Sequence, residues 1–146
     1  MKPVKVGLLG LGTVGTGVVR IVEGHQEDLQ NQVGSPIQIV KILVQNKAKA
    51  RSLAVDESKL TEDPWDIISD PEIDVIVEVM GGITHTRTYI LEAISRGKSI
   101  VTANKDLMAL HGPEILEAAK ENGCDVLYEA SVAGGIPIIR TLIEGF

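Results

Sequence analysis

Residues 4–15 read Val4-Lys5-Val6-Gly7-Leu8-Leu9-Gly10-Leu11-Gly12-Thr13-Val14-Gly15. The apolar run Val4–Leu9 predicts a strand, and it leads directly into a Gly-x-Gly-x-x-Gly turn. A helical stretch from Thr13 to about Gln30 follows the glycines. In such a unit the first glycine permits the tight turn, the second lets a pyrophosphate approach the backbone, and the third allows close helix–strand packing. The strand–turn–helix context predicts nucleotide binding, with a purely structural glycine turn as the alternative.

The composition favours an α/β protein with an aliphatic core. The chain has 146 residues, which is the usual length of one domain, and 44% of them are hydrophobic but only 3% aromatic. A core built from Val, Ile, Leu and Ala suits a parallel sheet that is covered on both faces.

Charge and cysteine content exclude several classes of protein. A net charge of −6 argues against a sequence-independent nucleic-acid binder, which needs a basic surface. Cys124 is the single cysteine, so no intrachain disulfide can form, which suits a reducing cytoplasm. No apolar run is long enough to span a bilayer, and the first residues begin no signal peptide. We therefore expect a soluble, cytoplasmic protein without a membrane or nucleic-acid partner.

Apolar runs alternate with amphipathic stretches along the whole chain, which is typical of repeated βαβ units. The pattern predicts strands at Val4–Leu9, Ile37–Val44, Val75–Val79, Ser99–Thr102 and Asp125–Tyr128. It predicts helices at Thr13–Gln30, Asp66–Ser69, Thr86–Arg96, Pro113–Asn122 and from about Ile136. The polar segment Asn46–Glu62 is expected to be a partly helical surface excursion. The fold class is therefore a doubly wound, mainly parallel Rossmann sheet, with ligands at the carboxyl ends of the strands.

The end of the chain indicates that residues 1–146 are one dinucleotide-binding domain of a longer polypeptide. The last predicted helix carries several apolar residues and stops at Gly145-Phe146 without a polar tail. A helix of this kind is expected to lead into further structure.

The residues after the second strand bear on which cofactor binds. NAD-selective Rossmann domains place an acid at this strand end to bind the ribose 2′-hydroxyl. Here Gln45 and Lys47 follow instead, with Lys49 and Arg51 further on. Cations at this point favour a 2′-phosphate, although a solvated basic turn is an alternative. We expect NADP to be preferred, with NAD as the alternative cofactor.

Three later segments follow predicted strands and carry candidate site residues. Gly81 and Gly82 allow the backbone to pass close to a ligand, or simply form a turn. Lys105 can present a compact cation to a ligand, or be an ordinary solvated lysine. Glu129 begins a small-residue loop whose oxygen atoms suit a hard cation, or else it caps the following helix.

Four segments in order resemble homoserine dehydrogenase. They are Gly10–Gly15, Glu78-Val79-Met80-Gly81-Gly82, Thr102-Ala103-Asn104-Lys105-Asp106-Leu107-Met108-Ala109 and Glu129-Ala130-Ser131-Val132-Ala133-Gly134-Gly135-Ile136-Pro137-Ile138. The resemblance covers nearly the whole chain. It implies a nicotinamide-dependent oxidoreductase that interconverts L-homoserine and L-aspartate 4-semialdehyde in the biosynthesis of threonine, methionine and isoleucine.

The resemblance also implies roles for individual residues. The pyrophosphate is expected at Gly10, Gly12, Thr13, Val14 and Gly15, and the nicotinamide ribose at Gly81 and Gly82. Lys105 is expected where cofactor and substrate meet, where it contacts the cofactor and assists catalysis. A sodium ion is expected at the Glu129 side chain and at the carbonyl groups of Val132, Gly134 and Ile136.

The chain departs from the family pattern in two respects. The family's substrate domain, with its proton-donating lysine and its substrate-binding carboxylates, cannot be mapped onto these residues. We therefore expect the chain alone to be catalytically incomplete, and the full-length enzyme to be a homo-oligomer. The second departure is Gln45, where relatives often carry a basic residue, and it weakens the case for strict NADP preference.

Two other classes of protein are alternatives. A stand-alone nucleotide-sensing Rossmann module would share the fold but would not need Lys105 or the loop after Glu129. An acylating semialdehyde dehydrogenase would need a nucleophilic cysteine, whereas Cys124 is expected to be structural. The three histidines show no metal-ligand spacing and are expected at the surface.

Overall fold

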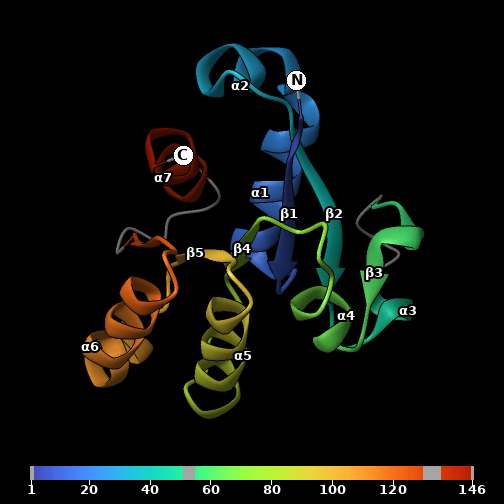
Figure 1. The fold of residues 1–146 in the computed structure, drawn as a ribbon. Helices are drawn as coiled ribbons and strands as arrows, with labels where there is room; N and C mark the ends of the chain where they lie inside the picture. The colour runs from blue at the N-terminus through green and yellow to red at the C-terminus, as the bar shows by residue number, and fades with distance from the viewer. Residues whose placement is uncertain (1, 51–54, 130–135, 146) are drawn as a thin grey trace.

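Six parallel strands form one sheet in the order β3-β2-β1-β4-β5-β6, as seen in a computed structural model that describes residues 2–50, 55–129 and 136–145 (Figure 1). The strands are β1 Val4–Leu9, β2 Ile37–Leu43, β3 Leu60–Thr61, β4 Val75–Glu78, β5 Ser99–Thr102 and β6 Val126–Tyr128. Every pairing between neighbouring strands is parallel. The strand order reverses at β1, with β2 on one side and β4 on the other. The predicted doubly wound Rossmann fold is confirmed.

Helices cover both faces of this sheet (Figure 1). One face carries α1 Thr13–Gly24, α2 Gln26–Val33 and α7 Ile136–Gly145. The other carries α4 Trp65–Ile68, α5 Thr84–Ser95 and α6 Lys105–Glu121. A short helix α3, Lys47–Ala50, and a 3₁₀ turn, Glu57–Lys59, lie between β2 and β3 in the chain.

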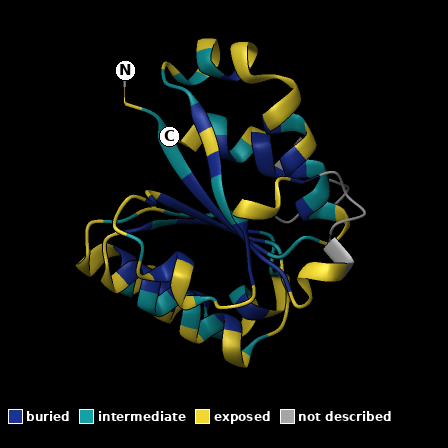
Figure 2. Ribbon diagram, turned by 90° about the vertical axis from the view of Figure 1, so that its right-hand side faces the viewer, coloured by how far each residue is buried: buried dark blue, intermediate teal, exposed yellow. Residues whose placement is uncertain are grey.

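Each face of the sheet has its own aliphatic core, because successive strand residues point to opposite faces. Val6 and Leu8 pack with helices α1, α2 and α7, whereas Leu9 packs with α4, α5 and α6. The central strands β4 and β5 and the second half of β1 are buried (dark blue in Figure 2), as the aliphatic composition predicted, whereas β6 and parts of β2 are more exposed. Among the described residues, no helix is long and apolar enough to cross a membrane.

The strand register brings the ends of all six strands into one line, since Thr61 at the end of β3 pairs with Leu43. Leu9 pairs with Leu43 on one side and with Glu78 on the other, Glu78 pairs with Thr102, and Thr102 pairs with Tyr128. Each of these residues is the last of its strand. The segments that follow them therefore all start from the same edge of the sheet, which we call the carboxyl edge.

Two predicted helices differ by more than two residues from those in the structure. The stretch predicted as Thr13–Gln30 forms two helices, because His25 leaves the helical conformation at φ −131° and ψ 39°. Helix α6 begins at Lys105 rather than at Pro113, and Pro113 lies inside it. The missed start signal is Asn104, whose side-chain oxygen accepts a hydrogen bond from the Leu107 N–H at 3.0 Å. Pro113 is on the exposed face of the helix, where the lost backbone hydrogen bond leaves a carbonyl open to water.

The segment expected to be a surface excursion contains an unpredicted strand. Leu60 and Thr61 pair with Ile42 and Leu43 and form the outermost strand β3. Two residues are too few to show the alternation that identifies a strand in a sequence.

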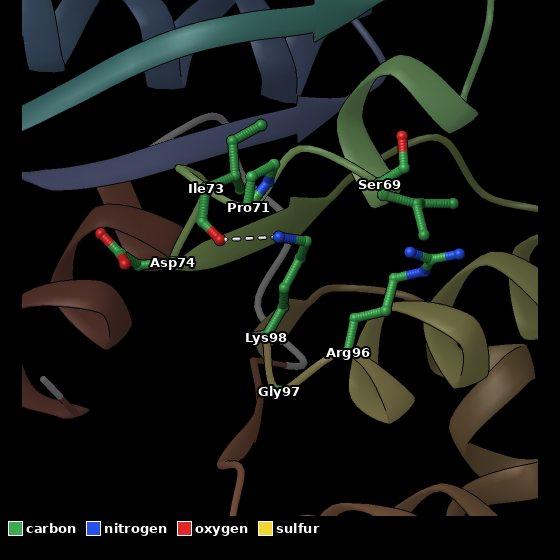
Figure 3. Close-up of a pocket in the computed structure, with 8 residues that line it drawn as sticks. Ser69, Pro71, Ile73, Asp74, Arg96, Gly97 and Lys98 are labelled. Carbon is green, nitrogen blue, oxygen red and sulfur yellow. Dashed lines mark hydrogen bonds between the residues drawn. The ribbon is translucent and has the colours of Figure 1, made fainter.

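A hollow of about 600 Å³ lies at the opposite, amino edge of the sheet (Figure 3). It is lined by residues that precede β4 and β5, including Asp74, Arg96 and Lys98. The Lys98 amine is buried and donates hydrogen bonds to the carbonyl groups of Asp70 and Ile73, the second at 2.8 Å. Burial lowers the pKa of Lys98, and the nearby Asp70 and Asp74 carboxylates partly offset this effect. Since this lysine is already bonded to backbone carbonyls, we assign it a structural role.

Replacing Lys98 by Met tests this role. Met keeps the aliphatic stem but leaves the Ile73 carbonyl without its lysine donor, so we expect a loss of about 1–3 kcal/mol in the free energy of unfolding. Urea unfolding followed by circular dichroism measures it. The matched control is Arg96→Met, which removes only an exposed ion pair with Glu92 and should change stability by less than about 0.5 kcal/mol. Equal stability of the two variants would contradict a structural role for Lys98.

Candidate functional site

The turn between β1 and α1 uses two of its glycines for structural reasons. Gly10 has φ 111°, and a Cβ atom there would lie 2.9 Å from the Met80 Cα. A Cβ atom on the buried Gly15 would collide with the Gly10 carbonyl oxygen. The first and third glycines are therefore required by the backbone conformation and by the packing of α1 against the turn.

Gly12 has no such structural requirement. Its φ of −80° suits any residue, its position is exposed, and no described heavy atom lies within 4 Å of a Cβ atom placed there. Gly12 is the N-cap of α1, which has no side-chain cap and no acidic residue in its first turn. The first backbone N–H groups of the helix thus have no side-chain cap among the described residues. One of these N–H groups belongs to the exposed Thr13, next to the open space at Gly12. This combination suits an anion, since those N–H groups and the helix dipole favour negative charge.

The end of β2 differs from its prediction in one respect. Gln45 and Lys47 are exposed at the carboxyl edge, as expected. The neighbouring β3 strand, however, brings a carboxylate to this point, because Glu62 accepts a hydrogen bond from the Lys47 N–H at 3.0 Å. The sequence has no acid at the end of β2, but Glu62, which follows β3, brings a carboxylate to the same place. Of the other predicted cations, Lys49 has no described side chain and Arg51 lies outside the described residues.

Gly81 and Gly82 form a turn that only glycine adopts without strain. Their φ angles are 75° and 79°, so two consecutive residues are in the left-handed region. Side chains from three elements bond to this turn. The Glu78 carboxylate accepts the Gly81 N–H at 3.0 Å, Thr86 donates to the Gly81 carbonyl at 2.5 Å, and Asn104 donates to the Gly82 carbonyl at 2.6 Å.

Glu78 is a residue of this site that sequence reasoning did not single out. It is fully buried at the end of β4, and burial raises the pKa of its carboxyl group. Hydrogen bonds from Thr102 at 2.5 Å and from the Met80 and Gly81 N–H groups at 3.0 Å oppose that rise. The available signal was a single acid in the otherwise aliphatic run Val75–Val79.

Lys105 lies close to the glycine turn in the fold. It is the exposed first residue of α6, and its neighbour Asn104 bonds directly to Gly82. A cation at a helix N-terminus opposes the helix dipole, and so helix stability does not explain why a lysine stands here. The position does put an exposed lysine at the carboxyl edge, one residue after the Asn104 that bonds to the glycine turn.

The predicted cation loop is described only in part. Glu129 follows β6, and Thr141 of α7 donates a hydrogen bond to its carboxylate at 3.3 Å. Val132 and Gly134 lie outside the described residues, and Ile136 is the first residue of α7. Within the described part of the chain, no group of three acidic, histidine or cysteine side chains is arranged for a metal ion. The sodium site remains a prediction.

The structure argues against Cys124 as a nucleophile. Cys124 precedes β6 and so lies toward the amino edge, away from the glycine turns. Burial raises the pKa of its thiol, and its sulfur lies 3.5 Å from the Ile94 carbonyl oxygen.

Among the histidines, His85 stacks on Tyr89 with ring centroids 6.3 Å apart, and it lies near the start of α5.

Known proteins resemble this chain over nearly its whole length. A family model described as the NAD-binding domain of homoserine dehydrogenase matches residues 10–129. Homoserine dehydrogenase from Bacillus subtilis is 54% identical over 145 residues, which cover 99% of this chain and 34% of that protein. The corresponding protein of Pseudomonas aeruginosa is 43% identical over 145 residues, or 99% of this chain and 33% of its own length.

A solved structure agrees with these matches. The crystal structure of a homoserine dehydrogenase from Thiobacillus denitrificans superposes with a TM-score of 0.86 at 47% identity, covering 99% of this chain and 33% of the other. The chain thus spans about a third of the length of the relatives it matches. With its Rossmann sheet and its glycine turns at the carboxyl edge, the chain belongs to the homoserine dehydrogenase family and corresponds to its NAD-binding domain.

Proposed function

We propose that this chain supplies the cofactor-binding part of an NAD(P)-dependent oxidoreductase that interconverts L-homoserine and L-aspartate 4-semialdehyde. The main structural support for this proposal is the open space at Gly12, next to the start of α1, which has no side-chain cap. Membership of the family supports the substrate pair and favours this reading over a stand-alone nucleotide sensor.

The residues of the carboxyl edge fit a dinucleotide. The pyrophosphate would lie over Gly10, Gly12, Thr13, Val14 and Gly15, where the N–H groups at the start of α1 are available. The nicotinamide ribose would lie beside Gly81 and Gly82, which β4 places next to β1. When bound, the nicotinamide ring accepts or donates the hydride that interconverts an alcohol and an aldehyde.

Lys105 is proposed to be the residue of this chain nearest to the reaction. Its ammonium group would contact the nicotinamide end of the cofactor and orient the substrate oxygen, because a flexible lysine stem carries a compact charge. Its place at the start of α6, tied to the glycine turn through Asn104, supports this assignment.

Cofactor selectivity is proposed to depend on opposing charges at the end of β2. Lys47 and Gln45 favour NADP by attracting and bonding to a 2′-phosphate. Glu62 opposes it, because its carboxylate bonds to the Lys47 backbone at the same point. We propose NADP as the preferred cofactor, with NAD also accepted.

Three further parts of the proposal rest on the family resemblance and on composition. A sodium ion would bind the Glu129 carboxylate together with the carbonyl groups of Val132, Gly134 and Ile136. The full-length enzyme would be a homo-oligomer. The single cysteine and the acidic net charge support a cytoplasmic protein without a nucleic-acid partner.

Replacing Gly12 by Ser tests cofactor binding. Ser is a better N-cap than Gly, so the free energy of unfolding should be unchanged or slightly higher. The new side chain would fill the open space and bond to the N–H groups that a pyrophosphate needs. We expect calorimetric titration with NADPH to show at least a tenfold loss of affinity, which is about 1.4 kcal/mol. Unchanged affinity in the folded variant would place the pyrophosphate elsewhere.

Two substitutions at the end of β2 test selectivity. Lys47→Ala should weaken NADPH binding more than NADH binding, because only NADPH carries the 2′-phosphate. Glu62→Gln should raise the ratio of NADPH to NADH affinity, because it removes a negative charge near that phosphate. We expect each ratio to change about threefold to tenfold, as for one partly exposed charge interaction. If both variants had the same ratio of NADPH to NADH affinity as the unmodified chain, neither residue would interact with the 2′-phosphate.

A further inference from the structure

The side chains that hold the Gly81–Gly82 turn form one connected group, which we call the Glu78 cluster: Glu78, Thr86, Thr102 and Asn104. Three of its members are almost completely buried, with exposed fractions of 0% for Glu78 and Thr102 and 1% for Thr86. They come from four consecutive elements or their ends, namely β4, α5, β5 and the start of α6. The proposed function assigns no role to Glu78, Thr86 or Thr102.

The bonds of the cluster hold the turn from both sides. One Glu78 oxygen accepts the N–H groups of Met80 and Gly81, both at 3.0 Å. Thr86 donates to the Gly81 carbonyl, and Asn104 donates to the Gly82 carbonyl. Two consecutive residues in the left-handed region are therefore fixed at three backbone groups by side chains. Sparsely populated backbone conformations of this kind persist only where several surrounding contacts hold them, and they are concentrated at ligand-binding sites.

The same cluster also fixes the start of α6. Thr102 donates to the other Glu78 oxygen at 2.5 Å and accepts the Asn104 N–H at 3.1 Å. The Asn104 side chain in turn caps α6 through the Leu107 N–H and reaches across to Gly82. Capping needs only the side-chain oxygen, whereas the contact with Gly82 needs the amide N–H₂ group. A serine would also cap the helix but has no amide N–H₂ group with which to make this second bond.

We propose that the Glu78 cluster positions the Gly81–Gly82 turn against the start of α6, so that the turn and Lys105 present a preformed surface to the nicotinamide end of the cofactor. The inference rests on the proposed function, because it assumes that the nicotinamide lies at this turn. The cluster residues are positioning residues: they act through the turn and through the start of α6. Preorganisation of this kind improves affinity because less ordering is required when the ligand binds.

Binding of two ligands to three variants tests the proposal. The ligands are NADPH and 2′-phosphoadenosine 5′-diphosphate, which has the same phosphates and adenosine but lacks both the nicotinamide and the ribose that carries it. Asn104→Ser keeps a helix-capping oxygen and loses the bond to Gly82, and it adds no negative charge beside Glu78. Thr102→Val removes the hydroxyl that joins Glu78 to Asn104, and Thr102→Ser is its matched control because it keeps that hydroxyl.

We expect Asn104→Ser and Thr102→Val to weaken NADPH binding about tenfold, or about 1.4 kcal/mol, and to leave the fragment within about twofold. Thr102→Ser should bind both ligands like the unmodified chain. Hydrogen exchange of the Gly81 N–H group should also become faster in Thr102→Val, since this N–H bonds to Glu78. If Thr102→Val fails to fold, Asn104→Ser decides the question, because its residue is only partly buried, its cap is kept and no charge is added.

Two results would overturn the inference alone. One is unchanged NADPH affinity in the folded variants, and the other is an equal loss for NADPH and for the fragment, which would indicate a general electrostatic or folding effect. If instead the unmodified chain bound neither ligand, the proposed function itself would fail, and the inference with it.

Discussion

The arrangement of this molecule depends on the parallel register that ends all six strands in one line. The last residues of the strands are paired in turn across the sheet: Thr61, Leu43, Leu9, Glu78, Thr102 and Tyr128. In parallel sheets the segments after the strands begin at the same edge, and ligands bind where the strand order reverses. The register therefore brings segments from residues 10, 44, 79, 103 and 129 onward to one edge, although they are widely separated in the sequence.

The carboxyl edge combines open and tightly bonded regions, each with a physical reason. At Gly12 the space is open and the helix start is uncapped, which suits a ligand that brings its own negative charge. At Gly81 and Gly82 the backbone is held by buried side chains, which suits a ligand whose orientation matters for reaction. The hollow at the amino edge differs from both, because its buried Lys98 already bonds to backbone carbonyls.

Much of this could be predicted from the sequence because the signals are local. The β1 run and its glycines specify one strand–turn–helix unit, and the aliphatic strands identify a sheet buried on both faces. The Pro113 prediction was wrong because a proline start signal was preferred to the cap at Asn104. Strand β3 was missed because two residues carry no periodicity, and with it the approach of Glu62 to Lys47 was missed. The role of Glu78 depends on hydrogen bonds to residues up to 24 positions away, which no local pattern reveals.

We propose that the cofactor lies along the carboxyl edge, from the end of β2 to the start of α6. Titration of the ¹⁵N-labelled chain with NADPH, followed by amide chemical shifts, tests this most directly. The largest shifts are expected at Gly10, Gly12 and Thr13, at Gly81 and Gly82, and at Lys105, with little change around Lys98. Shifts concentrated around Lys98 and Arg96 at the amino edge, with the glycine turns unaffected, would contradict it.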